Sequence, residues 1–305
     1  MIKHFLDIAS IRNKDLKDII AISHSMKIEL KKEDNLRPLE GKILAMIFDK
    51  PSTRTRISFD VGMRQLGGKT VVLEGVSSQL DRGETISDTA KVLSRYVDAI
   101  MIRTTDHQRL LELANHATVP VINGLTDETH PCQIMADIMT LEEHKGMLQD
   151  LVIAWTGDGN NVLNSLMEAS VHFGYKLRVA TPEPHKPSEN YLNSARLKGA
   201  YIEYSTDPIW AVTNADCVIT DTWESMGREG QETVMVGHNI FAPYQVNESL
   251  MAKAKKDAIF MHCLPAHRGQ EVTDAVMDGP QSVVFDEAEN RLHTQKGILV
   301  WCLDA

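Results

Sequence analysis

The sequence predicts an α/β protein of two domains, each a parallel sheet covered by helices. Three observations support this prediction. Short apolar runs alternate with longer amphipathic stretches, a pattern typical of parallel strands connected by helices. The length of 305 residues suits two domains of ordinary size. The apolar runs also fall into a group of four followed by a group of five.

The strand candidates are the apolar runs bounded by polar residues, glycine or proline. They are residues 42–48, 69–74, 98–103, 119–123, 151–156, 176–181, 200–204, 216–220 and 258–263. Two medium sheets are more usual than one very large open sheet. We therefore expect the first four strands and the next five to form separate sheets, and a single nine-stranded sheet is the alternative.

The helix candidates lie between these strands. They are Asn13–Lys31, Thr53–Leu66, Thr85–Tyr96, Pro131–His144, Asn161–Phe173 and Asn190–Lys198. In the first, Leu16, Ile19 and Ile20 lie close to helical spacing. We expect Pro131–His144 to connect the two sheets. The tail, Val284–Trp301, is predicted to contain a last strand and a helix.

Composition narrows the functional classes. The formal net charge of −10 argues against a general binder of nucleic acid or of anionic membranes, which would need a basic surface. The four cysteines are scattered and none is in a CxxC pair, which indicates reduced thiols rather than disulfides. The start of the chain has early acidic residues and no long apolar run, so we expect no signal peptide, no membrane span and a cytoplasmic location.

An anion site is predicted after the first strand, where Ser-Thr-Arg-Thr-Arg begins at Ser52. Ser52 suits the N-cap of the next helix. The unpaired N–H groups of a first helical turn bind anions, and Thr53 and Thr55 add hydroxyl donors. Arg54 can grip a phosphate with two hydrogen bonds. A phosphate is therefore the expected ligand, and an ordinary capped helix with solvated arginines is the alternative. A Walker motif is absent.

Two further strand ends carry candidate residues. Arg103 ends the strand 98–103, which should lie near the strand leading to Ser52. His130 precedes Pro131, a residue that suits the first position of a helix. His130 and Gln133 would then face the same crevice from a third strand end, because ligands of parallel sheets bind beyond the carboxyl ends of the strands. Capping or surface positions are the alternatives.

Three motifs in the second half of the chain are open to more than one interpretation. Gly157–Asn161 and Glu183 resemble a dinucleotide-binding pattern, but Val162 occupies the third glycine position. Asp221 follows a strand and suits an ammonium group, together with Ser225, and a turn-capping Asp is the alternative. His262 and Cys263 are adjacent on a strand and should point to opposite faces. A metal site built from these two and His267 is therefore disfavoured, whereas a nucleophilic Cys–His pair stays open.

Taken together, these motifs resemble the aspartate/ornithine carbamoyltransferase family, and within it the ornithine-specific members, over nearly the whole chain. The motifs that carry the resemblance are STRTR (52–56), SSQLDRGE (77–84), RYVDAIMIR (95–103), HPCQ (130–133), GDGNNVLNSL (157–166), DTWESMG (221–227), HCLPAHRG (262–269) and FDEAENRLH (285–293).

The resemblance implies the domain functions and the reaction. Residues 1–140 would bind carbamoyl phosphate, with the helix 286–305 packing back on them as the second of two linking helices. Residues 141–285 would bind ornithine. The carbamoyl group would pass from carbamoyl phosphate to the δ-amine of L-ornithine, giving L-citrulline and phosphate in arginine biosynthesis, or the reverse in arginine breakdown. No metal or redox cofactor is implied.

The resemblance also implies the roles of individual residues. Arg103, His130, Cys263 and Asp221 would be catalytic. The carbamoyl phosphate site would comprise Ser52, Thr53, Arg54, Thr55, Gln79, Arg103, His130, Gln133, Cys263, Leu264 and Arg291. Asn164 would hold the α-carboxylate of ornithine, with Asp221 and Ser225 on its α-ammonium and Met226 contacting it through its backbone. Gln79 would come from the neighbouring subunit of a homotrimer with shared active sites.

Two other functions compete with the transferase. A nicotinamide-dependent oxidoreductase would use Gly157–Asn161 and Glu183, and a binding protein would keep the fold without turnover. Within the transferase reading, Glu224 stands in DTWESMG where a neutral residue is common, which leaves a diamine substrate open.

Overall fold

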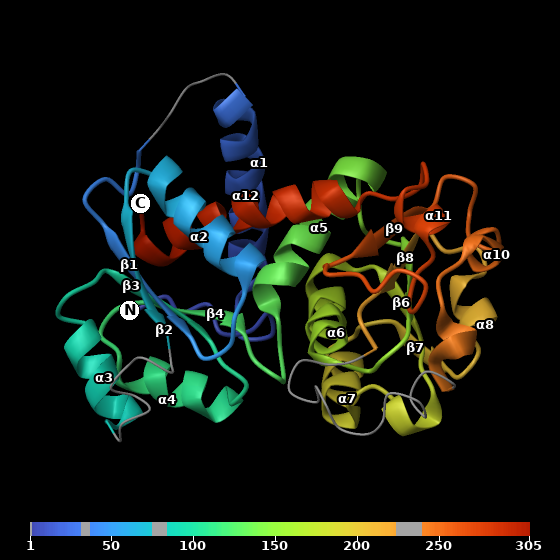
Figure 1. The fold of residues 1–305 in the computed structure, drawn as a ribbon, viewed down its shortest axis with the longest axis horizontal. Helices are drawn as coiled ribbons and strands as arrows, with labels where there is room; N and C mark the ends of the chain where they lie inside the picture. Colours follow the sequence, from blue (N-terminus) through green and yellow to red (C-terminus); the bar gives the residue numbers. More distant parts are fainter. Residues whose placement is uncertain (1, 32–36, 75–83, 224–239) are drawn as a thin grey trace. The chain divides into compact units, whose positions relative to one another are not determined.

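The computed structural model describes residues 2–31, 37–74, 84–223 and 240–305. It contains two parallel sheets, one of four strands and one of five (Figure 1). The prediction of two sheets is confirmed and the single nine-stranded sheet is wrong. The chain divides into unit 1, which comprises Met1–Ala136 with Glu289–Ala305, and unit 2, Asp137–Ala288.

The sheet of unit 1 has the strand order β2-β1-β3-β4. The strands are β1 (Ile43–Phe48), β2 (Lys69–Glu74), β3 (Ala99–Arg103) and β4 (Val121–Leu125). Every residue of β3 and β4 is buried, as expected for parallel strands with helices on both faces. The chain moves from β1 outward to β2 and then returns to place β3 on the other side of β1. This change of direction creates a switch point between β1 and β3, where ligands of parallel sheets bind.

Helices cover both faces of this sheet. The helices of unit 1 are α1 (Asn13–Lys31), α2 (Thr53–Gln65), α3 (Ile86–Leu93), α4 (His107–His116) and the start of α5 (Pro131–Lys145). Apolar residues of α3 and α4 form one core cluster with β1 and β3. α1 meets the last helix, α12 (Val284–Leu303), at Gly297, where a Cβ atom would lie 2.8 Å from the carbonyl oxygen of Ile19. A larger residue would force these two helices apart.

The sheet of unit 2 has the strand order β7-β6-β5-β8-β9. Its strands are β5 (Val152–Thr156), β6 (Lys176–Ala180), β7 (Ile202–Ser205), β8 (Cys217–Thr220) and β9 (Ile259–His262). The strands progress outward from β5 to β7, and β8 then pairs with the other side of β5. A second switch point therefore lies between β5 and β8.

Helices also cover this second sheet. They are α6 (Asn161–Phe173), α7 (Glu189–Leu197), α8 (Pro208–Val212), α10 (Glu248–Met251) and α11 (Asp274–Met277), with short 3₁₀ turns at Glu183–His185 and Ala242–Tyr244. One core cluster joins α8, α10 and α11 to the central strands. Among the described residues, no helix is long and apolar enough to cross a membrane.

Two helices carry the chain between the units. The boundary after Ala136 falls inside α5, and the boundary before Glu289 falls inside α12. The strand expected in the tail is wrong, since Val284–Leu303 is one helix. Just before this helix, Ser282 forms one isolated backbone bridge with Phe260. The helix starts two residues later, at Val284, so the bridge does not extend into a strand.

Candidate active site

The first group of site residues lies at the switch point of unit 1, at the N-terminus of α2. Ser52 is the N-cap residue in extended conformation, but its side chain makes no capping hydrogen bond. The first turn of α2 contains no acidic residue. The positive end of the helix dipole therefore has no carboxylate of its own first turn beside it, and the position suits an external anion.

Thr55 brings two arginines together. Its Oγ1 accepts hydrogen bonds from Nη1 of Arg103 at 3.2 Å and from Nη2 of Arg291 at 2.8 Å. All three side chains are buried, so the two guanidinium groups are held in place by the protein. The pairing of β1 with β3 sets Arg103 opposite Phe48, which confirms the predicted adjacency of their strands. Arg291 comes from α12, from the other end of the chain.

His130 is a buried, neutral imidazole. It directly precedes α5, whose first residue is Pro131, as predicted. Burial lowers the pKa of His130 well below its ordinary value, and the charges of Arg291, Arg103 and Arg54 lower it further. The imidazole can therefore donate one hydrogen bond and accept another near neutral pH. Gln133, the third residue of α5, is also fully buried.

Arg54 lies close enough to His130 for its charge, like those of Arg103 and Arg291, to lower the pKa of the imidazole. Arg54 is half-buried in the first turn of α2. Asp49, the one acid close to this turn in sequence, is engaged by Arg109 of α4 at 3.1 Å. Sequence reasoning missed Arg109. Its pairing leaves the cationic character of the anion site to Arg54, Arg103 and Arg291.

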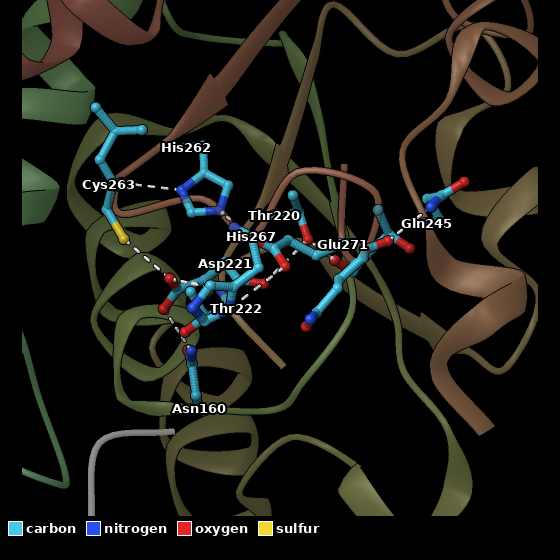
Figure 2. Close-up of polar contacts among 12 residues, drawn as sticks. Asn160, Thr220, Asp221, Thr222, Gln245, His262, Cys263, His267 and Glu271 are labelled. Carbon is cyan, nitrogen blue, oxygen red and sulfur yellow. Dashed lines mark hydrogen bonds and ion pairs between the residues drawn. The ribbon is translucent and has the colours of Figure 1, made fainter. Parts of the chain in front are cut away.

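The second group of residues surrounds Asp221, at the switch point of unit 2 (Figure 2). Its Oδ1 accepts hydrogen bonds from the backbone N–H of Thr222 at 2.8 Å and from Sγ of Cys263 at 3.0 Å. Its Oδ2 accepts from Nδ2 of Asn160 at 2.7 Å. These residues follow the carboxyl ends of β5, β8 and β9. The parallel order of the strands therefore gathers them around one carboxylate.

Cys263 is a protonated thiol in this arrangement. Burial raises its pKa well above the ordinary value, and the neighbouring Asp221 charge raises it further. The thiol donates to Asp221, while the ring of His262 is engaged elsewhere. Its Nδ1 accepts from the backbone N–H of Leu264 at 2.9 Å, and its Nε2 lies 3.2 Å from Glu271. These contacts do not support a nucleophilic Cys–His pair.

The expectation that His262 and Cys263 point to opposite faces is wrong. β9 ends at His262, so the alternation of a strand does not extend to Cys263. Ligand atoms of Asp221, His262 and Cys263 lie within 4.8 Å of one another, whereas His267 is not a member of this group. Each of the three side chains is already hydrogen-bonded, so a cation would have to displace those bonds.

The glycine-rich loop after β5 does not resemble a phosphate cradle. A Cβ atom at Gly159 would lie 2.5 Å from the carbonyl oxygen of His185 and 2.6 Å from that of Lys186. Two carbonyl oxygens facing the loop repel a pyrophosphate rather than bind it. Glycine is required here because the backbone of 185–186 passes so closely, and the nicotinamide reading loses its main support.

Asn164 lies on the second turn of α6 and is only 7% exposed. Asn161, which sequence reasoning did not select, is the first residue of the same helix and is half-buried. Asn160 was also missed, although an Asn before a predicted helix is a known cap signal. Gln79, Glu224, Ser225 and Met226 lie outside the described residues.

The two parallel-sheet units and the arginine-lined anion site define a class of protein. The fold is that of an α/β protein with two parallel sheets, and two buried arginines meet at Thr55 beside the strand ends of the first. Residues 3–143 match the family model of the aspartate/ornithine carbamoyltransferase carbamoyl-P binding domain, and residues 149–302 match the Asp/Orn binding domain of the same family. The chain belongs to the aspartate/ornithine carbamoyltransferase family.

Individual relatives agree with this assignment. The chain is 64% identical to the ornithine carbamoyltransferase of Agrobacterium fabrum over 99% of its own length and 98% of that protein. It is 63% identical to the enzyme of the same name from Rhizobium meliloti over the full length of both. Among solved structures, ornithine carbamoyltransferase from Pyrococcus furiosus superimposes with a TM-score of 0.95 at 49% identity, covering 99% of this chain and 97% of that one.

Proposed function

We propose that this protein transfers the carbamoyl group of carbamoyl phosphate to the δ-amine of L-ornithine, forming L-citrulline and phosphate. The observation that carries the proposal is the pair of switch-point sites. One unit holds buried arginines at a helix N-terminus, and the other holds a buried carboxylate beside a protonated thiol. The identity of 61–64% with eight ornithine carbamoyltransferases supports ornithine as the acceptor.

The phosphate group binds at the N-terminus of α2. Ser52, Thr53, Arg54 and Thr55 surround it together with Arg103. Backbone N–H groups of the first turn and the guanidinium groups form charge-assisted hydrogen bonds with its oxygens. This cationic environment also stabilises the phosphate as it leaves, because negative charge accumulates on it while the bond to the carbamoyl carbon breaks.

The carbonyl oxygen of the carbamoyl group binds Arg103, Thr55 and His130. Attack by the δ-amine places negative charge on this oxygen, and each preorganised donor is worth about 3–4 kcal/mol of transition-state stabilisation. The neutral state of His130 fits this role because an imidazole N–H donates without adding a fourth fixed cation. In unit 1, Gln133 accepts from the carbamoyl amide through its side-chain oxygen, with Arg291 nearby. In unit 2, the backbone carbonyls of Cys263 and Leu264 accept from it.

Ornithine binds in unit 2. Asp221 takes the α-ammonium, with Ser225 and the backbone of Met226, and Asn164 takes the α-carboxylate. The protonated Cys263 thiol lies against Asp221 at 3.0 Å and suits the neighbourhood of an amine. A δ-amine is mostly protonated near neutral pH, since a comparable lysine amine titrates near ~10.4. The site must therefore select the neutral form or remove its proton.

We further propose a homotrimer in which Gln79 completes a neighbour's site. Ile57 of α2 is 56% exposed, and Val71 and Val72 of β2 are 47% and 38% exposed. β2 is an edge strand, and a partner subunit would cover these side chains. A cytoplasmic location and a role in arginine biosynthesis, or in arginine breakdown when reversed, complete the proposal.

Citrulline formation tests the reaction. The assay compares ornithine with N-acetylornithine, putrescine and aspartate at equal concentrations of carbamoyl phosphate. Ornithine is expected to be the preferred acceptor. Preference for putrescine would support the reading in which Glu224 favours a diamine, and preference for aspartate or no turnover would contradict the proposal. Arg54→Ala is expected to raise the KM for carbamoyl phosphate and lower kcat, because it removes a grip on the leaving phosphate.

The shared site has its own test. Arg54→Ala and Gln79→Ala proteins, each nearly inactive, are unfolded and refolded together in equal amounts. If Gln79 serves the neighbouring site, random assembly around a three-fold ring restores about a quarter of all sites. Recovery of no activity in a sample that contains mixed trimers would reject shared sites.

A further inference from the structure

Asn160 lies between β5 and α6, and both ends of its side-chain amide are used. Its Oδ1 accepts hydrogen bonds from the backbone N–H groups of Val162 at 3.1 Å and Leu163 at 3.2 Å. Its Nδ2 donates to Oδ2 of Asp221 at 2.7 Å, and the residue is only 7% exposed. One buried side chain thus connects the first turn of α6 to the carboxylate at the end of β8 (Figure 2).

We propose that Asn160 is a positioning residue for substrate binding. It fixes the Asp221 carboxylate against the N-terminus of α6, in the orientation that receives the α-ammonium group of ornithine. This inference rests on the proposed function.

Capping alone does not explain an asparagine here. Ser, Thr and Asp cap helices about as well as Asn, and Thr85, Asp106 and Asp207 do so elsewhere in this chain. Among these short side chains, only Asn carries an acceptor and a donor on one planar group. An Asp at this position would cap α6 but would present a second carboxylate to Asp221. The donor on Nδ2 is therefore the part of the side chain that the cap does not need.

The contact controls the orientation of the carboxylate. Thr222 and Cys263 both bind Oδ1 of Asp221. Within the described parts of the chain, Asn160 is the residue that binds Oδ2. With both oxygens held, the plane of the carboxylate is fixed before ornithine arrives. If Nδ2 is removed, the group can rotate about its bond to Cβ, and substrate binding must supply the lost order.

Two variants separate this role from capping. Asn160→Ser keeps a capping oxygen but cannot reach Asp221. We expect it to raise the KM for ornithine about tenfold, equivalent to about 1.4 kcal/mol. Its kcat should change less, and inhibition by inorganic phosphate should be unchanged. Asn247→Ser is the matched control, since Asn247 caps α10 through Leu250 at 3.0 Å. We expect it to leave all three quantities within twofold of the wild-type values.

Asn160→Asp provides a readout that a cap alone would not move. It is the same size and still caps α6, but it places two carboxylates in contact. Such a pair shares a proton and titrates as a unit. We therefore expect the pH profile of the ornithine KM to gain an ionisation that is absent from the wild-type protein and from Asn160→Ser.

Either of two results would overturn the inference. The first is an ornithine KM of Asn160→Ser within twofold of wild type, or a loss of phosphate inhibition as large as the loss of ornithine affinity. The second is a wild-type pH profile for Asn160→Asp, which also decides the matter if Asn160→Ser fails to fold. Wild-type turnover is measured in the same series. If the wild-type protein does not turn over ornithine, the proposed function is contradicted. If the wild type turns over ornithine and the Asn160 variants behave like it, only the role of Asn160 is contradicted.

Discussion

Replacing Thr55 with Val tests whether the protein preorganises its two arginines. The side chain is fully buried, and Val has nearly the same shape, so α2 should pack as before. The change removes the oxygen that accepts from Arg103 and Arg291. The variant therefore loses one hydroxyl and the orientation of two guanidinium groups, and it creates no cavity.

The magnitude follows from the two contacts. A hydrogen bond to a charged group contributes about 1.5–3 kcal/mol. The contact with Arg291 is 2.8 Å long and the contact with Arg103 is 3.2 Å long, so the second should lie at the low end of this range. We expect the free energy of unfolding to fall by about 3–4.5 kcal/mol, the sum of the two contacts. We also expect the KM for carbamoyl phosphate to rise at least about tenfold, because the phosphate site must order the arginines on binding.

Urea unfolding and steady-state kinetics measure the two effects. Thr89→Val is the matched control, since Thr89 is a buried helical residue of the same unit whose hydroxyl has no hydrogen-bond partner among the described residues. Its stability and kinetics should stay near the wild-type values. A Thr55→Val protein with a lowered stability but an unchanged KM for carbamoyl phosphate would refute the preorganisation argument. If both the stability and the KM stayed unchanged, the hydrogen bonds of Thr55 with Arg103 and Arg291 would themselves be contradicted.

Three further predictions concern titration and substrate contacts. His130 has a lowered pKa in the folded state, so the unfolded chain binds a proton first, and stability should fall as pH drops below ~6.5. His130→Asn should lose this component of the pH dependence in urea unfolding, and an identical dependence would contradict it. Cys263 should react slowly with iodoacetamide at pH 8. Asp221→Asn should accelerate this reaction several-fold, because the Asp221 charge helps to raise the thiol pKa. Mass spectrometry of the labelled peptide measures the rate, and an unchanged rate would contradict this cause. Asn164→Ala should raise the ornithine KM about tenfold, as expected for one lost charge-assisted hydrogen bond; a larger rise for Asn161→Ala would move the α-carboxylate contact to the first residue of α6.

Most of the fold follows from local pattern. All nine strands lie at or within about two residues of the apolar runs that predict them. Strands such as β3 and β4, buried on both faces, leave a strong signal, whereas the exposed edge strand β2 is recognised by its run of β-branched and apolar residues alone. α4 was missed although Asp106 caps it, since its polar residues dilute the helical periodicity. α3 ends at Leu93, three residues before its predicted end at Tyr96, because 94–96 form a turn. Boundaries depend on such turns more than on periodicity.

The candidate site was less accessible to sequence reasoning. Arg103 and Thr55 could be placed near each other because the pairing of parallel strands brings their ends together. The contact of Arg291 with Thr55 joins residues separated by 236 positions, and no local pattern encodes it; the family resemblance alone suggested Arg291. The hydrogen bond that Asn160 donates to Oδ2 of Asp221 depends on β5 and β8 being neighbours in the sheet. An alternation of strands and helices along the sequence does not determine that order.

The course of the chain through α12 has a consequence for protein synthesis. Unit 2 is continuous from Asp137 to Ala288, but unit 1 is completed only by Glu289–Ala305. Arg291 is made 188 positions after Arg103 (291 − 103). During translation, the growing chain therefore lacks one of the two arginines that Thr55 holds until residue 291 has emerged. A ribosome that stalls before residue 291 leaves a product in which the Thr55 hydroxyl lacks its contact from Arg291, so the arginine cluster is completed only after the whole of unit 2 has been made.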